Sequence, residues 1–466
     1  MYVFSPRVKP PPHNLTSAID ICQPCLRSPL GLQGDRPMLK KIACSLFIVL
    51  LGISLLRKPV FAQPTQAGYT RMILTFRKNA TPEEKRKILS SIKGAIPVED
   101  LPGFNIAIIE VPKARTLAIM EESKNSPSLR AAEKDFRINW IKDVDESPSL
   151  SASFEQAQGF AQNARFHWPW GQHQPSTPGI HWNLRRLKAP QAWVKTQGNG
   201  VRVAIIDTGV DCAHPDLNCN LSDGANMTNA ATPPMDDNGH GTHVAGIIAG
   251  QGKDGGVFGV APRVTLIPVK VLSADGSGNL SDVVSGIYWA MTHGAQVINM
   301  SLGAPTAATA LEQAVHKAYQ AGVVIVAAAG NDGENASRSG ETSTVDYPGA
   351  YPWVIAVAAS DRKDHIAPFS SFGPAVDITA PGDNILSTVP NGYEKMSGTS
   401  MASPHIAGVA ALAIASGISG PESVKGALNS SSSLLCPKVI FRGPECAPAT
   451  DEGNGIPDAS KIVALR

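Results

Sequence analysis

Residues 200–209 read GVRVAIIDTG and give the clearest fold signal in the sequence. A β-branched apolar run ends there abruptly in Asp207. A short continuous apolar run is typical of a strand that is buried on both faces, as in a parallel sheet covered by helices. Ligands and catalytic groups collect at the carboxyl ends of such strands. The stretch therefore predicts an α/β fold and makes Asp207 a candidate functional carboxylate.

The same pattern continues along the chain from about residue 180. Apolar strands alternate with helices rich in glycine and alanine, which predicts a parallel sheet covered by helices on both faces. The expected strands are 201–206, 264–271, 297–300 and 323–328, and the expected helices follow His240 and span 283–292 and 311–321.

Two further motifs carry candidate chemistry. Residues 238–246 read NGHGTHVAG, and the small neighbours leave His240 room to approach two partners. Residues 398–405 read GTSMASPH and present Ser400 between small residues at an expected loop-to-helix junction. A serine hydroxyl is inert at its own pKa and needs an adjacent base, itself held by a third group. His240 and Asp207 supply these two groups.

With the three motifs in the order Asp207, His240, Ser400, the chain resembles the subtilisin-like serine proteases (subtilases, peptidase family S8). The resemblance runs from about residue 182 to about residue 459. It implies a three-layer α/β domain with a mostly parallel sheet, and a serine endopeptidase that forms an acyl-enzyme on Ser400. In that chemistry His240 is the general base, and Asp207 holds its imidazole in the right tautomer.

The resemblance also implies the rest of the site. Asn331 matches the family's oxyanion asparagine, and the Ser400 backbone amide at a helix N-terminus is the second donor. An extended substrate would lie between two edge segments and bind through backbone hydrogen bonds that any sequence can make, which implies broad specificity. The expected substrate-binding residues are Gly276, Ser277, Gly278 and Leu280 on the first edge, Ser301, Leu302 and Gly303 on the second, and Ala328, Ala329 and Gly330 in the wall of the primary pocket.

Asp346 departs from the family pattern. It stands in TVDYPG, residues 344–349, where many members carry glycine or asparagine at the floor of the primary pocket. A carboxylate there favours arginine or lysine at the substrate position P1, before the cleaved bond. The alternative is a surface aspartate turned to solvent, because the preceding loop, 332–343, is longer than usual.

A structural calcium ion is a second implication of the resemblance. Asp216, in the HPDL segment 214–217, matches an aspartate that ligates calcium in the family, and a carboxylate suits that ion. The partner loop instead places Lys253 where an asparagine ligand often stands, although Asp254 could substitute. No cofactor is expected for catalysis.

The N-terminal region has the organisation of an exported zymogen. Lys40 and Lys41 precede an apolar run, 42–56, that is shorter than the ~20 residues of a membrane crossing, and VFA at 60–62 fits a signal cleavage site. We expect a signal peptide at 38–62 and a secreted or periplasmic protein, with an uncleaved anchor as the alternative. Residues 1–37 form a proline-rich leader or an over-extended start.

Residues 63–144 resemble in position the inhibitor prodomain of the family. The expected elements are strands 69–76, 104–111 and 136–141 and helices 82–92 and 114–122, which together predict a small α+β, ferredoxin-like sandwich. Such a prodomain is a folding template that is cleaved off, and its C-terminal tail occupies the active site. The alternative is a permanent binding module. Residues 145–178 read as a linker and processing region, and 179–466 as the catalytic domain.

Cysteine content and charge add two constraints. Four cysteines follow the expected signal, and export implies two disulfides among three possible pairings. We favour Cys212–Cys219 and Cys436–Cys446 because each closes a short loop. The formal net charge is only +2, which gives no argument for a nucleic-acid or membrane partner. The expected partners are polypeptide substrates and the chain's own prodomain, and the protein is expected to be a monomer.

Two rival interpretations remain. The sedolisin relatives use a glutamate base, whereas His240 favours activity near neutral or alkaline pH, since the base must be unprotonated. A non-catalytic binding protein on the same scaffold is the alternative outside the enzymes.

Overall fold

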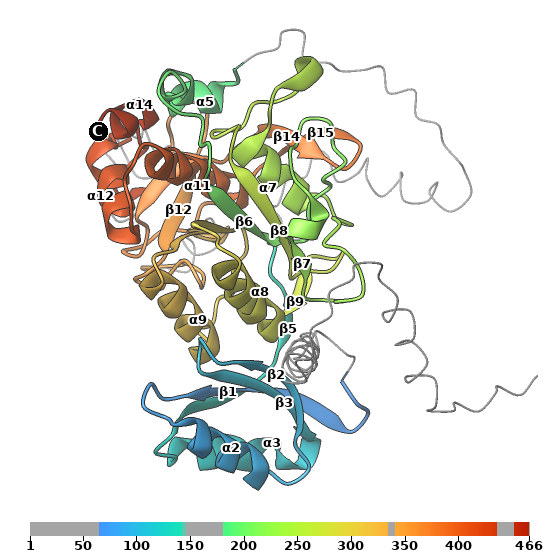
Figure 1. Cartoon of the computed structure of the whole chain (residues 1–466). Helices are drawn as coiled ribbons and strands as arrows, with labels where there is room; N and C mark the ends of the chain where they lie inside the picture. The colour runs from blue at the N-terminus through green and yellow to red at the C-terminus, as the bar shows by residue number, and fades with distance from the viewer. Residues whose placement is uncertain (1–64, 143, 145–179, 334–340, 436–451, 466) are drawn as a thin grey trace, which may run out of the picture. The chain divides into compact units, whose positions relative to one another are not determined.

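The computed structural model describes residues 65–142, 144, 180–333, 341–435 and 452–465 (Figure 1). The expected leader, signal peptide and linker, and the pairing Cys436–Cys446, lie outside these residues. Within the described ranges, no helix has both the length and the apolar character needed to cross a membrane.

A seven-stranded sheet forms the centre of the main domain, which we define as the described residues from 180 onward. The strand order is β13-β12-β11-β10-β6-β8-β7, and neighbouring strands pair in parallel. This confirms the predicted α/β class. The strands are β6 (Arg202–Asp207), β7 (Ala225–Asn226), β8 (Thr265–Lys270), β10 (Val297–Met300), β11 (Val324–Ala328), β12 (Ile355–Ser360) and β13 (Ile378–Pro381).

Helices cover both faces of this sheet, as predicted. Alternate residues of β6 enter two different apolar clusters, because successive side chains of a strand point to opposite faces. Val203 and Ile205 pack with helices α7 and α11, whereas Ala204 and Ile206 pack with α8 and α9. These helices are α7 (His240–Ala249), α8 (Leu280–Thr292), α9 (Thr309–Gln320) and α11 (Thr399–Ala415). The three-layer architecture is therefore confirmed.

Smaller elements complete the main domain (Figure 1). Strands β14 (Ile385–Val389) and β15 (Gly392–Met396) form an antiparallel hairpin. The remaining elements are α5 (Trp182–Arg186), α6 (Ala189–Ala192), α12 (Pro421–Ser431), α14 (Ala459–Ala464), the short strand β9 (Ser277–Asn279) and the 3-10 turns η4 (Leu221–Asp223) and η5 (Lys253–Gly255).

Residues 65–134 form an N-terminal module of α+β type. Its antiparallel sheet has the order β2-β3-β1-β4, and one face packs against α2 and α3. The other face, with Ile73 and Ile108, joins the apolar cluster of α8 and α9. The elements are β1 (Tyr69–Phe76), α2 (Pro82–Ser91), β2 (Ile96–Leu101), β3 (Ile106–Pro112), η3 (Lys113–Arg115), α3 (Thr116–Lys124) and β4 (Leu129–Lys134). Strands β2 and β4 were not predicted.

The start of α2 is closed by a capping box. The Thr81 hydroxyl accepts the Glu84 amide at 3.2 Å, and the Glu84 carboxylate accepts the Thr81 amide at 2.7 Å. This reciprocal pair satisfies two backbone donors that the helix leaves without an internal partner.

The strand expected at 136–141 has a different partner from the one predicted. Strand β5 (Arg137–Asn139) does not join the sheet of the N-terminal module but pairs antiparallel with β9 of the main domain. The module's ladder ends where the Asp135 amide donates to the Arg71 carbonyl, and the Asp135 carboxylate then binds Ser281 at the start of α8. The alternation of 136–141 indicates an extended chain, but it carries no information about which sheet edge that chain joins.

Candidate active site

Asp207 and His240 lie side by side at the carboxyl edge of the sheet. Asp207 ends β6, and His240 begins α7. The His240 Nδ1 donates to Asp207 Oδ1 at 2.8 Å, and the Asp207 side chain is fully buried. The same oxygen accepts the Thr208 amide at 2.7 Å. The carboxylate is thus oriented from two sides toward the imidazole, which leaves Nε2 as the nitrogen for proton transfer.

The buried carboxylate of Asp236 fixes the loops that carry this pair, and sequence reasoning missed it. It accepts the Thr208 hydroxyl at 2.8 Å, the Gly239 amide at 2.9 Å and the Thr242 amide at 2.9 Å. Thr208 in turn accepts the Gly241 amide at 2.9 Å. Gly241 must be small here, because a Cβ at this position would lie 2.1 Å from the Gly209 carbonyl oxygen.

Ser400 lies in the first turn of α11, which packs with α7 on the same face of the sheet. Its hydroxyl donates to the Ser301 carbonyl at 3.2 Å, and the Ser301 hydroxyl donates to the Ser400 carbonyl at 2.7 Å. These two bonds hold the serine against the segment that follows β10.

Asn331 stands beside the helix start. Its Oδ1 accepts the Thr399 amide at 3.0 Å and the Thr399 hydroxyl at 2.9 Å. Both contacts fix the amide plane, so the Nδ2 group is the end that faces outward as a donor. It donates to the Lys142 carbonyl oxygen at 2.9 Å. A main-chain carbonyl therefore lies against the predicted oxyanion donor.

The chain's own residues 135–142, which we call the connecting segment, lie along both predicted substrate edges. On the first edge β5 pairs with β9, and the Trp140 amide donates to the Gly276 carbonyl at 3.1 Å. On the second edge the Gly303 amide donates to the Trp140 carbonyl at 2.9 Å. Backbone pairing of this kind is how an extended peptide adds to an open sheet edge.

Several other predicted pocket residues contact this segment or the pocket floor. The Leu280 amide donates to the Phe136 carbonyl at 2.9 Å, and Leu302 is buried in the same apolar cluster as Trp140. The Ala329 carbonyl accepts the Asp346 amide at 2.8 Å. Ala328 ends β11 and is buried.

Asp346 is buried, not turned to solvent. Its exposed fraction is 2%, and it lies against Gly303 and Gly330, where an added Cβ would come within 2.8 Å of it. The Lys142 ammonium group lies 2.9 Å from Asp346 Oδ2. The solvent-facing alternative is therefore wrong.

Asp332 is a second acid in this pocket, and sequence reasoning missed it. Its carboxylate forms an ion pair with the same Lys142 ammonium group. Burial acts to lower the pKa of Lys142, but its bonds to Asp332 and Asp346 outweigh burial and raise the pKa. For Asp346, burial raises the pKa and Lys142 partly offsets the rise. The position directly after Asn331 was the available signal for Asp332, whereas no local signal marked Lys142.

Both carboxylate oxygens of Asp216 already accept a backbone amide. Its two carboxylate oxygens accept the Lys253 and Val257 amides, each at 2.6 Å. Backbone N–H groups thus point at the position where a cation would need oxygen ligands. In the part of the chain that the structure describes, no group of three or more histidine, cysteine, aspartate or glutamate residues could hold a metal ion. The donor set of this loop does not fit the expected calcium ion.

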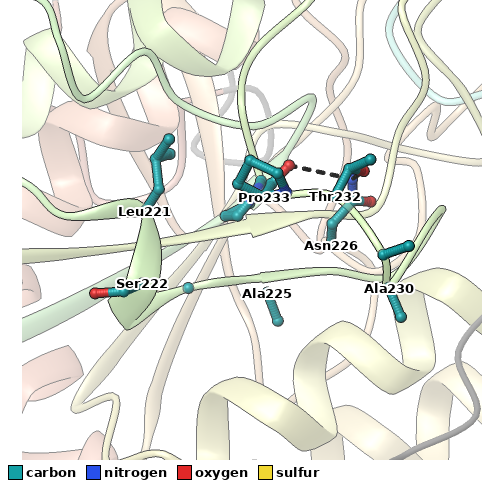
Figure 2. A pocket seen from close by; sticks show the side chains of 10 residues that line it. Leu221, Ser222, Ala225, Asn226, Ala230, Thr232 and Pro233 are labelled. Atoms are coloured by element: carbon teal, nitrogen blue, oxygen red, sulfur yellow. Dashed lines mark hydrogen bonds between the residues drawn. The ribbon is translucent and has the colours of Figure 1, made fainter.

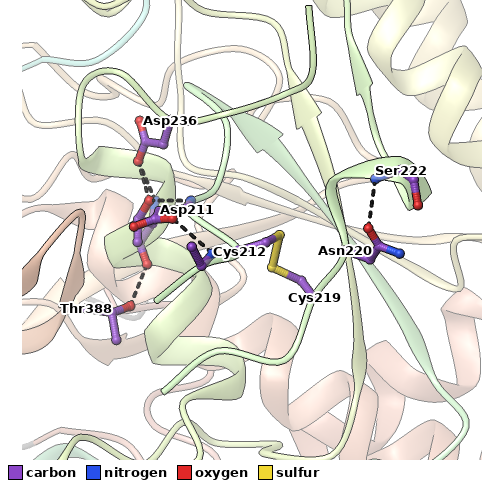
Figure 3. Close-up of a disulfide and its surroundings, with 9 residues drawn as sticks. Asp211, Cys212, Cys219, Asn220, Ser222, Asp236 and Thr388 are labelled. Atoms are coloured by element: carbon purple, nitrogen blue, oxygen red, sulfur yellow. Dashed lines mark hydrogen bonds between the residues drawn. A yellow bond between two sulfur atoms is a disulfide. The ribbon is translucent and has the colours of Figure 1, made fainter. Parts of the chain in front are cut away.

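The predicted pairing Cys212–Cys219 is confirmed (Figure 3). The disulfide closes a short loop just beyond Asp207. The Asp211 amide donates to the Thr242 hydroxyl of α7 at 3.0 Å, so this loop is also tied to the helix that begins with His240.

A hollow of about 460 Å³ lies beside β7 and η4 (Figure 2). Asn226 shapes it by donating to the Thr232 hydroxyl at 3.0 Å. None of the predicted catalytic or substrate-binding residues lines it, and its lining offers no acid–base pair.

Comparison with known proteins identifies the family. The model of the subtilase family matches residues 198–458, which is more than half of the chain. The chain belongs to the subtilase family. It is a serine endopeptidase by membership, as predicted.

Individual relatives support this assignment. Subtilisin E of Bacillus subtilis (strain 168) is 45% identical over 276 residues, which cover 58% of this chain and 67% of the relative. Subtilisin DY of Bacillus licheniformis is 51% identical over 217 residues, or 46% and 77% of the two chains. The thermophilic serine proteinase of Bacillus sp. (strain AK1) is 36% identical over 350 residues, or 74% and 78%. This last match is too long to lie within 198–458 alone, so it reaches into the N-terminal part of the chain.

The amide-bound state of Asp216 leads to a stability prediction. Treatment with a calcium chelator should leave the melting temperature of the purified protein unchanged, because amides already satisfy this carboxylate. Asp216→Asn should lower the melting temperature, since it weakens two charge-assisted hydrogen bonds at a cost of about 2 kcal/mol. Asp223→Asn, at an exposed site in η4, serves as the control. Chelator-induced destabilisation that added calcium reverses would contradict the interpretation.

Proposed function

We propose that this subtilase is an exported endopeptidase, made as a zymogen whose N-terminal module inhibits it and whose own connecting segment is its first substrate. One observation carries the proposal: the segment lies along both substrate edges, with the Lys142 carbonyl on Asn331 Nδ2. The signal peptide expected at 38–62 supports export. The candidate site draws all its residues from one chain, which supports action as a monomer.

The geometry supports acyl transfer through Ser400. The Ser400 oxygen attacks the carbonyl carbon while its proton passes to His240 Nε2, and Asp207 stabilises the imidazolium that forms. Asn331 Nδ2 and the Ser400 amide hold the oxyanion. His240 then gives the proton to the leaving amine, and water hydrolyses the ester by the same route. Because Asn331 already donates to a carbonyl oxygen at 2.9 Å, it needs little rearrangement to serve the transition state.

The bond that follows Lys142 is the proposed maturation bond. Its carbonyl is the one at the oxyanion donor, and its side chain fills the primary pocket. The position lies just before the linker expected at 145–178. After cleavage, the β5–β9 pairing and the bond from Gly303 remain, so the module stays bound as an inhibitor.

The pocket favours a basic residue at P1. Asp346 lies at its floor and Asp332 also reaches the Lys142 ammonium group, so two carboxylates face one cation. A neutral P1 side chain would leave the buried Asp346 without a counterion, which is costly. Substrate recognition then combines backbone pairing along the two edges, which any sequence can make, with a requirement for positive charge at P1.

Processing of the full-length chain tests the maturation site. The purified wild-type chain should convert to two fragments, and N-terminal sequencing of the larger one should begin at Asp143. Ser400→Ala should remain uncut, and Lys142→Leu should slow conversion because the buried Asp346 then loses its counterion and Asp332 loses its partner. Lys124→Leu, at an exposed site on α3, is the matched control. A new N-terminus at another position would overturn the assignment.

Matched peptides that differ only at P1 test the pocket. For the mature enzyme, kcat/KM should be higher with lysine or arginine at P1 than with phenylalanine. Asp346→Asn should reduce kcat/KM for the lysine peptide by about 10- to 100-fold, the loss expected for one charged hydrogen bond. Asp332→Asn should have a smaller effect, because this carboxylate is more exposed. Asp223→Asn, at an exposed site in η4, controls for general damage, and an unchanged preference in Asp346→Asn would sink the idea.

A further inference from the structure

The contact between the N-terminal module and α8 buries more carboxylates than cations. The module contributes Glu99 from β2 and Glu110 from β3, the connecting segment contributes Asp135, and α8 contributes Asp282. Asp282 is 5% exposed and Glu110 is 6% exposed. We call Glu99, Asp135 and Asp282 the carboxyl cluster.

Neutral donors of the main domain form hydrogen bonds to all three members of the cluster. Glu99 accepts the Ser285 hydroxyl at 2.6 Å. Asp135 accepts the Ser281 hydroxyl at 2.6 Å and the Ser281 amide at 2.9 Å. Asp282 accepts the Asn279 side-chain amide at 2.8 Å. The bonds of Glu99 and Asp135 join the two parts, and none of these bonds neutralises charge.

Arg71 is the cation that acts on all three members. Its guanidinium also lies 3.4 Å from Glu110, so its single charge is shared among four carboxyl groups. Two further titratable groups act at Glu99: Asp100 of β2, which adds negative charge, and Tyr288 of α8, whose raised pKa keeps it neutral. A fully ionised cluster therefore holds excess negative charge away from water, where it destabilises the contact.

We propose that the carboxyl cluster is a proton-dependent latch, which holds the cleaved module on the protease in acidic solution and releases it in neutral or alkaline solution. This inference rests on the proposed function, in which the module is an inhibitor that must leave after cleavage. Release would then occur under the conditions in which the histidine base is unprotonated and the enzyme can work.

The pKa values of the cluster agree with binding at low pH and release at higher pH. Burial raises the pKa of Glu99 to about 7, and burial together with the charge of Asp135 raises that of Asp282 to about 7. Burial also raises the pKa of Asp135. When the module leaves, water reaches these groups and their pKa values return toward 4.5 and 3.8. The complex thus binds more protons than its separated parts, so its stability is present at low pH and is lost as pH rises toward 7.

The processed wild-type protein provides the direct test. The full-length chain, with an affinity tag at its C-terminus, is allowed to cleave itself, captured on resin and washed at about pH 6 or about pH 8. The module that remains bound is followed with time on a gel. We expect dissociation at pH 8 to be about tenfold faster or more. Between pH 6 and pH 8, each group whose pKa is about 7 in the complex weakens binding of the module about tenfold.

Neutral amides at two cluster positions should hold the latch closed. The double variant Glu99→Gln, Asp282→Asn mimics the protonated state, so its module should stay bound at pH 8 about as well as the wild-type module does at pH 6. Glu121→Gln, at an exposed site on α3 away from the cluster, should release its module like the wild type.

The outcomes separate the latch from the function on which it rests. An uncut band at both pH values would refute self-processing itself. Clean cleavage followed by equal dissociation of the wild-type module at both pH values would overturn the latch, even if the double variant failed to fold. Wild-type pH dependence in a folded double variant would overturn it as well.

Discussion

Burial of the parallel sheet on both faces is the constraint on which the remaining structure depends. Strand β6 loses contact with solvent on both sides, because Val203 and Ile205 face one helical layer while Ala204 and Ile206 face the other. Polar chemistry is thereby confined to the strand ends, where Asp207 is placed. Helix α7 starts at the same edge with His240. Because α7 packs against α11 through apolar side chains, Ser400 in the first turn of α11 comes to this edge from a distant part of the sequence.

The edges beside that site leave backbone groups available, and the chain satisfies them with its own connecting segment. Strand β9 pairs with β5, and Gly303 bonds to Trp140. Trp140 also anchors the segment through its indole N–H, which donates to the Gly278 carbonyl at 2.9 Å, and through burial of its ring. Recognition by backbone and one buried ring is independent of the chemistry at Ser400, so it persists when the bond after Lys142 is cut. The proposed inhibition and the proposed self-cleavage would thus follow from one contact.

The sequence allowed much of this to be predicted, within physical limits. Asp207, His240 and Ser400 stand in local patterns whose small or apolar neighbours mark them, and the apolar runs marked β6, β8, β10 and β11 because burial on both faces leaves a composition signal. The partner strand of β5 could not be predicted, because an extended chain can pair with any open sheet edge. The surroundings of Asp346 were also open, because they depend on how Gly303 and Gly330 approach it in three dimensions. Calcium was expected from Asp216, with Asp254 as a possible further ligand, yet Asp216 accepts the Lys253 and Val257 amides.

The two acids of the primary pocket connect specificity with folding. Asp332 acts to raise the pKa of Asp346, as like charges do when they share a site, and burial acts in the same direction. An empty pocket would therefore hold two repelling carboxylates, one of them almost without solvent. Lys142 places its ammonium group against both, and the opposite charge favours the ionised acids. The connecting segment thus places, together with β5, a counterion against both acids. The proposed preference for a basic residue at P1 rests on the same charge.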